Sequence, residues 1–371
     1  MTATVVSAVE AAMERVIDPE LRRPITELGM LDSVEETSPG TVSVAVSLTV
    51  QGCPLRGTIE EDVRTAALGV DGVSDVSVQV GYMDPERRRA LVDSLKRHSI
   101  SFTEPGSLTR VIAVASGKGG VGKSSVTVNL AAAMAADGLS VGVVDADVLG
   151  FSVPGLMGVH TRPTRVDEMI LPPVAHGVKV VSIGMFLEDN APVMWRGPML
   201  HRALEQFLTD VHFGDLDVLL LDLPPGTGDV AISVSQLLPH AEVVVVTTPQ
   251  SAAAQVAERA GTAAHRTGQK VLGVVENMSW IELPDGTRMT PFGEGGGAAL
   301  AQRLSEETGE SVSLLARIPL DPSLREGGDQ GTPVVLSHPD SAASKALTKL
   351  AARLAHRPRG LAGRQLGITP R

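Results

Sequence analysis

The 371-residue sequence is poor in cysteine and in aromatic residues. It contains one cysteine, so no disulfide can form within the chain, and this usage is typical of a reducing compartment. Aromatic residues make up 2% of the chain and hydrophobic residues 43%, so the cores must be built from Val, Leu, Ala and Met. A chain of this length is expected to form two or three domains.

An excess of basic charge and a long apolar run are also missing. The net charge of -11 makes the chain a poor electrostatic partner for the phosphates of DNA. No apolar run approaches the length of a membrane span. The N-terminus carries Glu10 and Glu14 and lacks a basic segment followed by an apolar one, so no secretory signal is expected. We therefore expect a cytoplasmic protein with no nucleic-acid partner and no stable insertion into membranes.

Residues 1–82 predict a small α+β domain. Apolar residues from Val5 to Val16 recur at helical spacing. Those from Val42 to Val50 alternate with mostly small polar residues, as in a half-buried strand. A helix from Arg56 to Ala67 and a second alternating stretch over 73–82 are expected to complete this domain.

The pattern changes after a charged and polar segment, 83–108, which predicts a short helix and a linker. Over residues 109–355, nearly continuous apolar runs such as R-V-I-A-V-A-S and A-E-V-V-V-V-T-T-P are separated by Ala-rich helical stretches. Strands without a polar face are buried on both sides, which predicts an α/β domain with a doubly wound, mainly parallel sheet. Ligands of such sheets bind at the carboxyl ends of the strands. The basic segment 356–371, rich in Pro and Gly, predicts a flexible tail.

A glycine-rich segment follows the first of these apolar runs. Residues Gly117 to Ser124 fit G-x-x-x-x-G-K-[ST] between an expected strand and an expected helix. Glycines let backbone N–H groups wrap phosphates, and the helix N-terminus points its positive end at them. We expect Lys123 to reach the β- and γ-phosphate oxygens and the hydroxyl of Ser124 to ligate Mg²⁺. A glycine-rich turn with an incidental lysine would not explain the complete motif in this context.

Two further segments place carboxylates at strand ends. Asp145 and Asp147 could hold Mg²⁺-bound water and orient an attacking water, although such a pair could equally cap a helix. Another apolar run ends at Asp222, the Walker B position, whose carboxylate is expected to meet Mg²⁺ through water. The turn that follows, 224–229, has the sequence P-P-G-T-G-D and could sense a γ-phosphate.

These segments together resemble a known family of ATPases. The loop K-G-G-V-G-K-S is similar to the deviant Walker A of the ParA/MinD/nitrogenase-iron-protein superfamily. The segments D-A-D-V-L-G-F-S-V-P-G-L-M-G, M-W-R-G-P-M-L, L-D-L-P-P-G-T-G-D and E-N-M-S resemble its Mrp/ApbC branch, the iron–sulfur cluster carrier ATPases. The first domain resembles the iron–sulfur assembly domain often fused to them, through V-I-D-P-E-L, I-T-E-L-G-M and T-V-Q-G-C-P. The two resemblances cover the chain from Val5 to about Leu354.

The resemblance implies ATP binding and slow hydrolysis in a homodimer, coupled to a conformational switch and to cluster transfer. Apo iron–sulfur proteins or assembly factors are the implied partners. Lys118 would reach the nucleotide of the other subunit, Asp147 would position the attacking water, and Asn277 would read the adenine edge. Lys118 could otherwise be a solvated loop charge and Asn277 a strand-end turn residue. Nucleotide contacts are expected from Gly117, Lys118, Gly119, Gly120, Val121, Gly122, Lys123, Ser124 and Ser125.

The chain departs from this family at the cluster motif. Cluster-binding members carry C-x-x-C after E-N-M-S, and two subunits would supply four thiolates to one bridging [4Fe–4S] cluster. Here the stretch reads W-I-E-L-P-D-G-T-R-M, and the carboxylates of Glu282 and Asp285 are hard ligands that suit a cluster poorly. Cys53 lies at an expected strand-to-helix turn. It is a ligand of a labile, shared cluster, a handle for cluster transfer, or a small residue that shapes the turn.

Two other classes of function stay open. A ParA/MinD-type positioning ATPase would need a basic face for DNA or an amphipathic helix for lipid. The segment 345–355 has leucines at helical spacing but few apolar residues, so we expect it to pack on the domain. A cluster-free scaffold that uses the nucleotide switch to bind client proteins would accommodate the missing cysteines. Trp195 and Arg196 fit either a protein interface or a buried anchor for the next helix.

Overall fold

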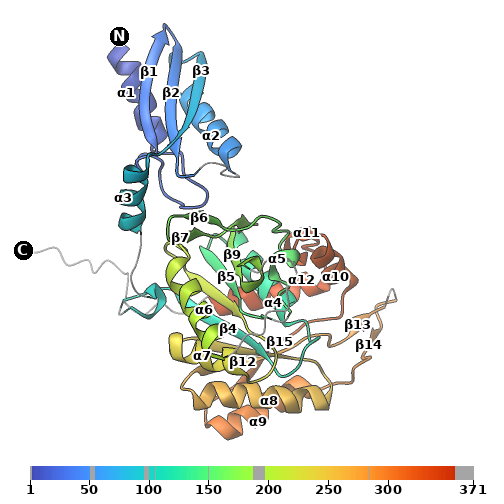
Figure 1. The fold of residues 1–371 in the computed structure, drawn as a ribbon. Coiled ribbons are helices and arrows are strands. Elements are labelled where there is room, and N and C mark those ends of the chain that lie inside the picture. Colours follow the sequence, from blue (N-terminus) through green and yellow to red (C-terminus); the bar gives the residue numbers. More distant parts are fainter. Residues whose placement is uncertain are drawn as a thin grey trace, which may run out of the picture.

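The small N-terminal domain is an α+β unit. The computed structural model describes residues 2–50, 55–95, 100–104, 106–148, 150–186, 197–283 and 285–355 of the chain. In the N-terminal domain β2 is the central strand, antiparallel to β1 and parallel to β3, and the helices pack on this sheet (Figure 1). Its elements are α1 (Thr2–Met13), β1 (Leu31–Ser38), β2 (Thr41–Leu48), α2 (Arg56–Leu68) and β3 (Asp75–Tyr82).

The sequence pattern predicts this domain well except at its edge. The alternating face of β2 is buried at Val42, Val44 and Val46, as expected, and α2 confirms the predicted second helix. The first helix ends at Met13, so Val16 lies in the turn beyond it. β1 has no counterpart in the predictions because its sequence L-D-S-V-E-E-T-S is mostly polar, and an edge strand needs little apolar surface.

The large domain contains a mainly parallel sheet, as the apolar runs predict. Within the described residues its strand order is β15-β12-β11-β4-β10-β5-β9-β8, and only β8 runs antiparallel to its neighbour. The nearly continuous apolar runs form β4, β5, β10, β11 and β12. The strands are β4 (Arg110–Ser116), β5 (Val141–Asp145), β8 (Val174–Ala175), β9 (Val178–Ser182), β10 (Val218–Asp222), β11 (Glu242–Thr247), β12 (Lys270–Glu276) and β15 (Ser313–Arg317).

Helices cover both faces of this sheet and enclose two cores (Figure 1). Along β4, Ala113 and Ala115 face one core while Ile112 and Val114 face the other, as strand geometry requires. One face carries α6 (Gly197–Asp210), α7 (Asp229–Leu237), α8 (Ser251–Arg266) and α9 (Gly296–Thr308). The other carries α4 (Lys123–Ala136), α5 (Val153–Leu156), α10 (Pro322–Asp329), α11 (Val334–Ser337) and α12 (Ala342–Ala355).

The leucines of α12 are buried against the large domain. Leu347, Leu350 and Leu354 are each at most 3% exposed and belong to the same core as α4. This confirms the expectation that the segment packs on the domain. In the part of the chain that the structure describes, no helix combines the length and the apolar character that crossing a membrane requires.

A third hydrophobic core contains residues of the small domain, of the helix that follows it and of a hairpin from the large domain. The remaining elements include α3 (Pro85–Leu95), a helical turn (Ser101–Thr103) in the expected linker, and the hairpin of β6 (Thr164–Val166) and β7 (Met169–Leu171). Residues of α3 and of this hairpin are buried in the hydrophobic cluster of the small domain. The boundaries 1–82, 83–108, 109–355 and 356–371 stay predictions, and the last of these segments lies outside the described residues.

Charged side chains also meet at the contact between the two domains. Lys179 of β9 is 1% exposed and lies near Asp18 and Glu20 of the small domain, which are each 5% exposed. Burial raises the pKa of Asp18, and burial together with the charge of Asp18 raises the pKa of Glu20 to about 7. Burial, followed by the nearby charge of Arg22, lowers the pKa of Lys179 to about 8. Ionised Glu20 is therefore unfavourable in the folded protein even beside a lysine.

The titration of Glu20 predicts a pH dependence of stability. The folded pKa of about 7 exceeds the ordinary value of 4.5, so the folded state binds this proton more tightly. The associated stability is fully present below pH 4.5 and is lost as the pH rises through about 7. Between pH 5 and 7.5 we expect urea unfolding to show a loss on the order of 2 kcal/mol in the wild type that Glu20→Gln lacks. The exposed Glu14→Gln should retain the wild-type slope, and equal slopes for all three proteins would contradict the prediction.

Candidate nucleotide-binding site

The predicted phosphate loop connects β4 to α4 at the centre of the sheet. β4 ends at Ser116 and α4 begins at Lys123. Gly120 and Gly122 have φ values of 77° and 80°, a left-handed conformation that favours glycine. At Gly117 the loop passes so close to α8 that an added Cβ would lie 2.3 Å from the backbone nitrogen of Ala257. Both the turn and its close packing therefore explain why glycines occur here.

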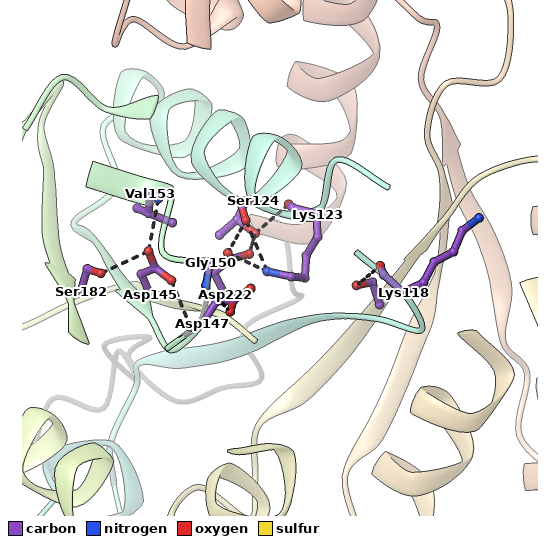
Figure 2. Close-up of polar contacts among 11 residues, drawn as sticks. Lys118, Lys123, Ser124, Asp145, Asp147, Gly150, Val153, Ser182 and Asp222 are labelled. Carbon is purple, nitrogen blue, oxygen red and sulfur yellow. Dashed lines mark hydrogen bonds and ion pairs between the residues drawn. The ribbon is translucent and has the colours of Figure 1, made fainter. Parts of the chain in front are cut away.

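Three side chains of α4 converge on Asp222 at the end of β10 (Figure 2). The ammonium of Lys123 lies 2.7 Å from Oδ2 of Asp222, and the hydroxyl of Ser124 donates to the same oxygen at 2.5 Å. Thr127 donates to Oδ1 at 2.8 Å. Asp222 is fully buried and Lys123 is 6% exposed, so the carboxylate depends on these donors in place of water.

Asp145, at the end of β5, is held in a similar way. It is fully buried and accepts hydrogen bonds from the backbone nitrogens of Asp147 and Val153 and from the hydroxyl of Ser182 (Figure 2). Burial and the nearby negative charge of Asp222 raise the pKa of Asp145 to about 7. Two buried carboxylates in one site disfavour each other's ionisation, and a bound cation would remove that cost.

The side-chain oxygens at this site are suitable ligands for a magnesium ion. Carboxylate and hydroxyl oxygens are the hard ligands that Mg²⁺ prefers, and it is commonly held by one or two carboxylates together with substrate phosphates and water. Ser124, Asp145 and Asp222 offer that set at the mouth of the phosphate loop. The described residues contain no group of three or more His, Cys, Asp or Glu side chains that could hold a metal ion by themselves. Two carboxylates and one hydroxyl suit a cation whose remaining ligands are phosphate oxygens and water.

Asp147 lies beside this cluster. Its Oδ1 accepts a hydrogen bond from the backbone nitrogen of Gly150 at 3.0 Å, and its side chain is 8% exposed (Figure 2). Asp147 follows Asp145 by two residues, so both carboxylates lie at the carboxyl end of β5. The predicted role in orienting water is compatible with this place.

Lys118 points away from the carboxylates in Figure 2. Its ammonium donates to Oε1 of Gln250, the residue before α8, at 3.1 Å. The backbone carbonyl of Lys118 accepts a hydrogen bond from Ser116, which fixes the loop but leaves the side chain free to change partner. Lys118 therefore takes no part in the buried cluster of Lys123 and Asp222 in its own chain.

Asn277 contacts the loop from the end of β12. Its side-chain nitrogen donates to the carbonyl of Val121 at 2.9 Å. Its side-chain oxygen is buried, and the described residues provide it with no hydrogen-bond partner. A buried acceptor without a donor is unfavourable, so this oxygen would be stabilised by a donor from a bound ligand or a water molecule.

The segment after Asn277 forms a short hairpin in place of a cysteine motif. Strands β13 (Ile281–Glu282) and β14 (Arg288–Met289) pair antiparallel. The ring of Trp280 is contacted by the guanidinium groups of Arg288 at 4.6 Å and Arg317 at 5.5 Å. The hairpin supplies no thiolate. The glycines after it open α9.

The structure brings together Lys123, Ser124, Asp145 and Asp222, with Asp147 and Asn277 at the same edge of the sheet. Cys53 and the pair Trp195–Arg196 lie outside the described residues. Sequence reasoning missed three participants, namely Thr127, Ser182 and Gln250. Thr127 could have been found, because a residue four positions after Lys123 lies on the same side of a helix. Ser182 and Gln250 are brought in only by tertiary structure.

Comparisons with known proteins give a consistent result. A family model described as NUBPL iron-transfer P-loop NTPase matches residues 107–355, and one described as iron-sulfur cluster assembly protein matches residues 7–80. A protein of Mycobacterium tuberculosis named iron-sulfur cluster carrier protein is 60% identical over 98% of this chain and 97% of its own. A protein of Synechocystis with the same name is 41% identical over 94% of this chain and 96% of its own.

Solved structures support the same fold. A nucleotide-binding protein from Archaeoglobus fulgidus in complex with ADP is 38% identical, with a TM-score of 0.56, over 66% of this chain and 96% of that chain. The septum site-determining protein MinD with Mg-ADP from Pyrococcus horikoshii is 25% identical, with a TM-score of 0.50, over 69% of this chain and 98% of that chain. These likenesses confirm the doubly wound P-loop fold and the resemblance stated from the motifs.

Gly122 offers a test of the loop geometry. In Gly122→Ala the new Cβ would lie 2.2 Å from Nδ2 of Asn277, at a residue with a φ of 80°. We expect the free energy of unfolding to fall by about 1–3 kcal/mol, measured by chemical denaturation. Gly119→Ala is the control, because nothing lies within 4 Å of its added Cβ and its φ is not positive. Equal stability of Gly122→Ala and the wild type would show that the loop adopts another conformation.

Proposed function

The chain belongs to the family of NUBPL-type iron-transfer P-loop NTPases, and from that premise we propose that it is a homodimeric ATPase of iron–sulfur cluster carriage. ATP binds at residues 117–125, with its adenine at Asn277, and is hydrolysed slowly. The observation that carries the proposal is the buried cluster of Lys123, Ser124, Asp145 and Asp222 beside a preformed phosphate loop. A lysine and two carboxylates that meet at the carboxyl edge of the sheet are among the groups that phosphoryl transfer requires.

The contacts indicate how the side chains act. Lys123 forms an ion pair with Asp222, and the phosphates of ATP would draw its ammonium away to their own oxygens. Ser124, Asp145 and Asp222 would hold Mg²⁺, which when bound offsets the charge of the phosphates. Asp147, fixed by the backbone nitrogen of Gly150, would orient the water that attacks the γ-phosphate. Asn277 would accept a hydrogen bond from the amino group of adenine through its buried oxygen.

Lys118 acts in the partner subunit under this proposal. Its ammonium donates a hydrogen bond to Gln250 at 3.1 Å, a contact with a neutral acceptor that a phosphate could readily replace. At each nucleotide, Lys118 would then come from one chain and Asp147, which orients the attacking water, from the other. Association of two subunits is required before either site is complete.

Mixing two inactive variants tests this arrangement. Lys118→Ala and Asp147→Asn should each hydrolyse ATP at least tenfold more slowly than the wild type. In a mixed dimer the Lys118→Ala subunit keeps its own Asp147 and receives Lys118 from its partner, so one of the two sites is complete. An equal mixture should therefore recover about a quarter of the wild-type rate, measured by phosphate release after exchange of subunits. A rate no higher than the mean of the two variants would place Lys118 in its own site.

Cluster carriage is the less direct part of the proposal. It is supported by the two family models and by relatives named iron-sulfur cluster carrier proteins. The chain itself offers one thiolate, Cys53, so a dimer offers two, and a partner protein or small thiols would have to complete the ligation of a cluster. The hairpin after Asn277 cannot supply them.

A cluster-free scaffold is the second candidate, because the segment that aligns with the cluster motif contains no cysteine. In that case the nucleotide-driven dimer would bind client proteins without carrying iron. No observation favours a positioning ATPase of the MinD type, since the leucines of α12 are buried in the large domain and the chain is acidic.

The role of Cys53 distinguishes these two candidates. If the chain carries a cluster, anaerobic reconstitution should yield iron, sulfide and charge-transfer absorbance in the wild type, and Cys53→Ser should lose most of each. Under the scaffold hypothesis Cys53→Ser supports maturation of client enzymes in cells as well as the wild type, whereas Lys123→Ala does not. Absence of iron and sulfide from the wild type, with full activity of Cys53→Ser, would reject cluster carriage and retain the ATPase.

A further inference from the structure

Thr127 lies on α4 one turn after Lys123, and its side chain is completely buried. Its hydroxyl lies 2.8 Å from Oδ1 of Asp222 and 3.0 Å from the backbone carbonyl of Lys123. The loop motif does not include this position, although its spacing of four residues from Lys123 places it on the same side of the helix. Its contact with the buried carboxylate at the end of β10 nevertheless sets it apart from an ordinary helical threonine.

A threonine hydroxyl has one proton, so its two acceptors compete. The contact with Asp222 is the shorter of the two, and an ionised acceptor forms the stronger hydrogen bond. Elsewhere in the described helices, the hydroxyl of Thr308 donates to the carbonyl of Leu304, four residues before it, and accepts from the backbone nitrogen of Glu310. Bonding back to the helix is therefore common for threonine, and the bond from Thr127 to Asp222 is a separate feature.

The two oxygens of Asp222 have different partners. Oδ1 accepts from Thr127, whereas Oδ2 accepts from Ser124 and faces the ammonium of Lys123. A carboxylate can rotate about its terminal torsion, whose energy profile is broad. The donor at Oδ1 fixes this rotation, and it thereby directs Oδ2 toward Ser124 and the phosphate loop.

We propose that Thr127 is a positioning residue that orients the carboxylate of Asp222 for the Mg²⁺ of the bound nucleotide. The inference rests on the proposed function, since it assigns the ion to the site formed by Ser124, Asp145 and Asp222. Groups that orient metal-binding side chains commonly change metal affinity by about 10–100-fold when they are removed. The effect of Thr127 should therefore be visible in the contribution of Mg²⁺ to ATP binding, and not only in protein stability.

Thr127→Val removes the hydroxyl and keeps the shape of the side chain, whereas Thr127→Ser keeps the hydroxyl. The measurement is the dissociation constant of a fluorescent ATP analogue, once in excess EDTA and once in excess Mg²⁺, for the full-length protein. The ratio of the two constants gives the gain in affinity that Mg²⁺ provides. We expect this ratio to fall about tenfold in Thr127→Val and to stay within about threefold of the wild type in Thr127→Ser.

Thr308→Val is the matched control, because it removes a hydroxyl that bonds back to its helix away from the site. Its ratio should equal that of the wild type. Circular dichroism establishes that each variant is folded, and Thr127→Ala replaces the valine variant if that variant does not fold. A role limited to stability would lower the midpoint of thermal unfolding in EDTA and leave the ratio unchanged.

The outcomes separate the inference from the function on which it rests. A wild type whose ATP affinity does not respond to Mg²⁺ overturns the proposed site and Thr127 with it. A wild type that does respond, together with an unchanged ratio in Thr127→Val or an equal loss in Thr127→Ser, overturns the role of Thr127 alone. A selective loss in Thr127→Val supports it.

Discussion

The geometry of the nucleotide site depends on one buried carboxylate, that of Asp222. A fully buried charge is costly unless donors replace the lost water, and here all three side-chain donors come from the first turns of α4. The same contacts fix the start of α4 relative to the end of β10. The position of the phosphate loop, which lies between β4 and α4, follows from this arrangement.

Asp145 adds a second constraint to the same place. Its raised pKa reflects burial close to another carboxylate, so the site without a bound cation is electrostatically unfavourable. Sites with perturbed ionisation of this kind are frequently functional. The repulsion between the two carboxylates therefore lowers the stability of the site without a cation. The same repulsion raises the affinity of the site for a cation that arrives with a phosphate ligand.

The segment after Asn277 lies outside the cluster of Lys123 and Asp222. The ATPase parts agree in sequence, geometry and relatives, whereas the segment after Asn277 has the hairpin of Trp280 and Arg288 in place of thiolates. Nothing in the Lys123–Asp222 cluster depends on that hairpin. The geometry of the nucleotide site therefore does not require a cysteine motif in this segment.

The sequence predicts those parts of the fold whose burial leaves a clear pattern. β4, β5, β10, β11 and β12 are buried on both faces and read as apolar runs. β1 is polar because it lies at an edge, and β9 contains Lys179, whose burial depends on the small domain. Hairpins as short as β6–β7 carry too few residues to show a period.

The same limit applies to the site. Lys123, Ser124, Asp145 and Asp222 were expected to meet because the carboxyl ends of parallel strands share one edge. The bonds of Ser182 to Asp145 and of Gln250 to Lys118 join segments far apart in the chain, and no local pattern encodes them. The family resemblance implied only that Asn277 lies near the adenine. Its hydrogen bond to Val121, and a side-chain oxygen without a partner among the described residues, are features of the tertiary structure.

The close packing of Gly117 on α8 and of Gly122 on Asn277 has a kinetic consequence. The loop is fixed on both sides by atoms that leave no space for a side chain, so its backbone entropy is lost during folding and not during nucleotide binding. Under the proposed function, binding of ATP then requires rearrangement of side chains such as Lys123 rather than ordering of the loop backbone. Capture of ATP at the proposed site should therefore not be delayed by ordering of the loop backbone.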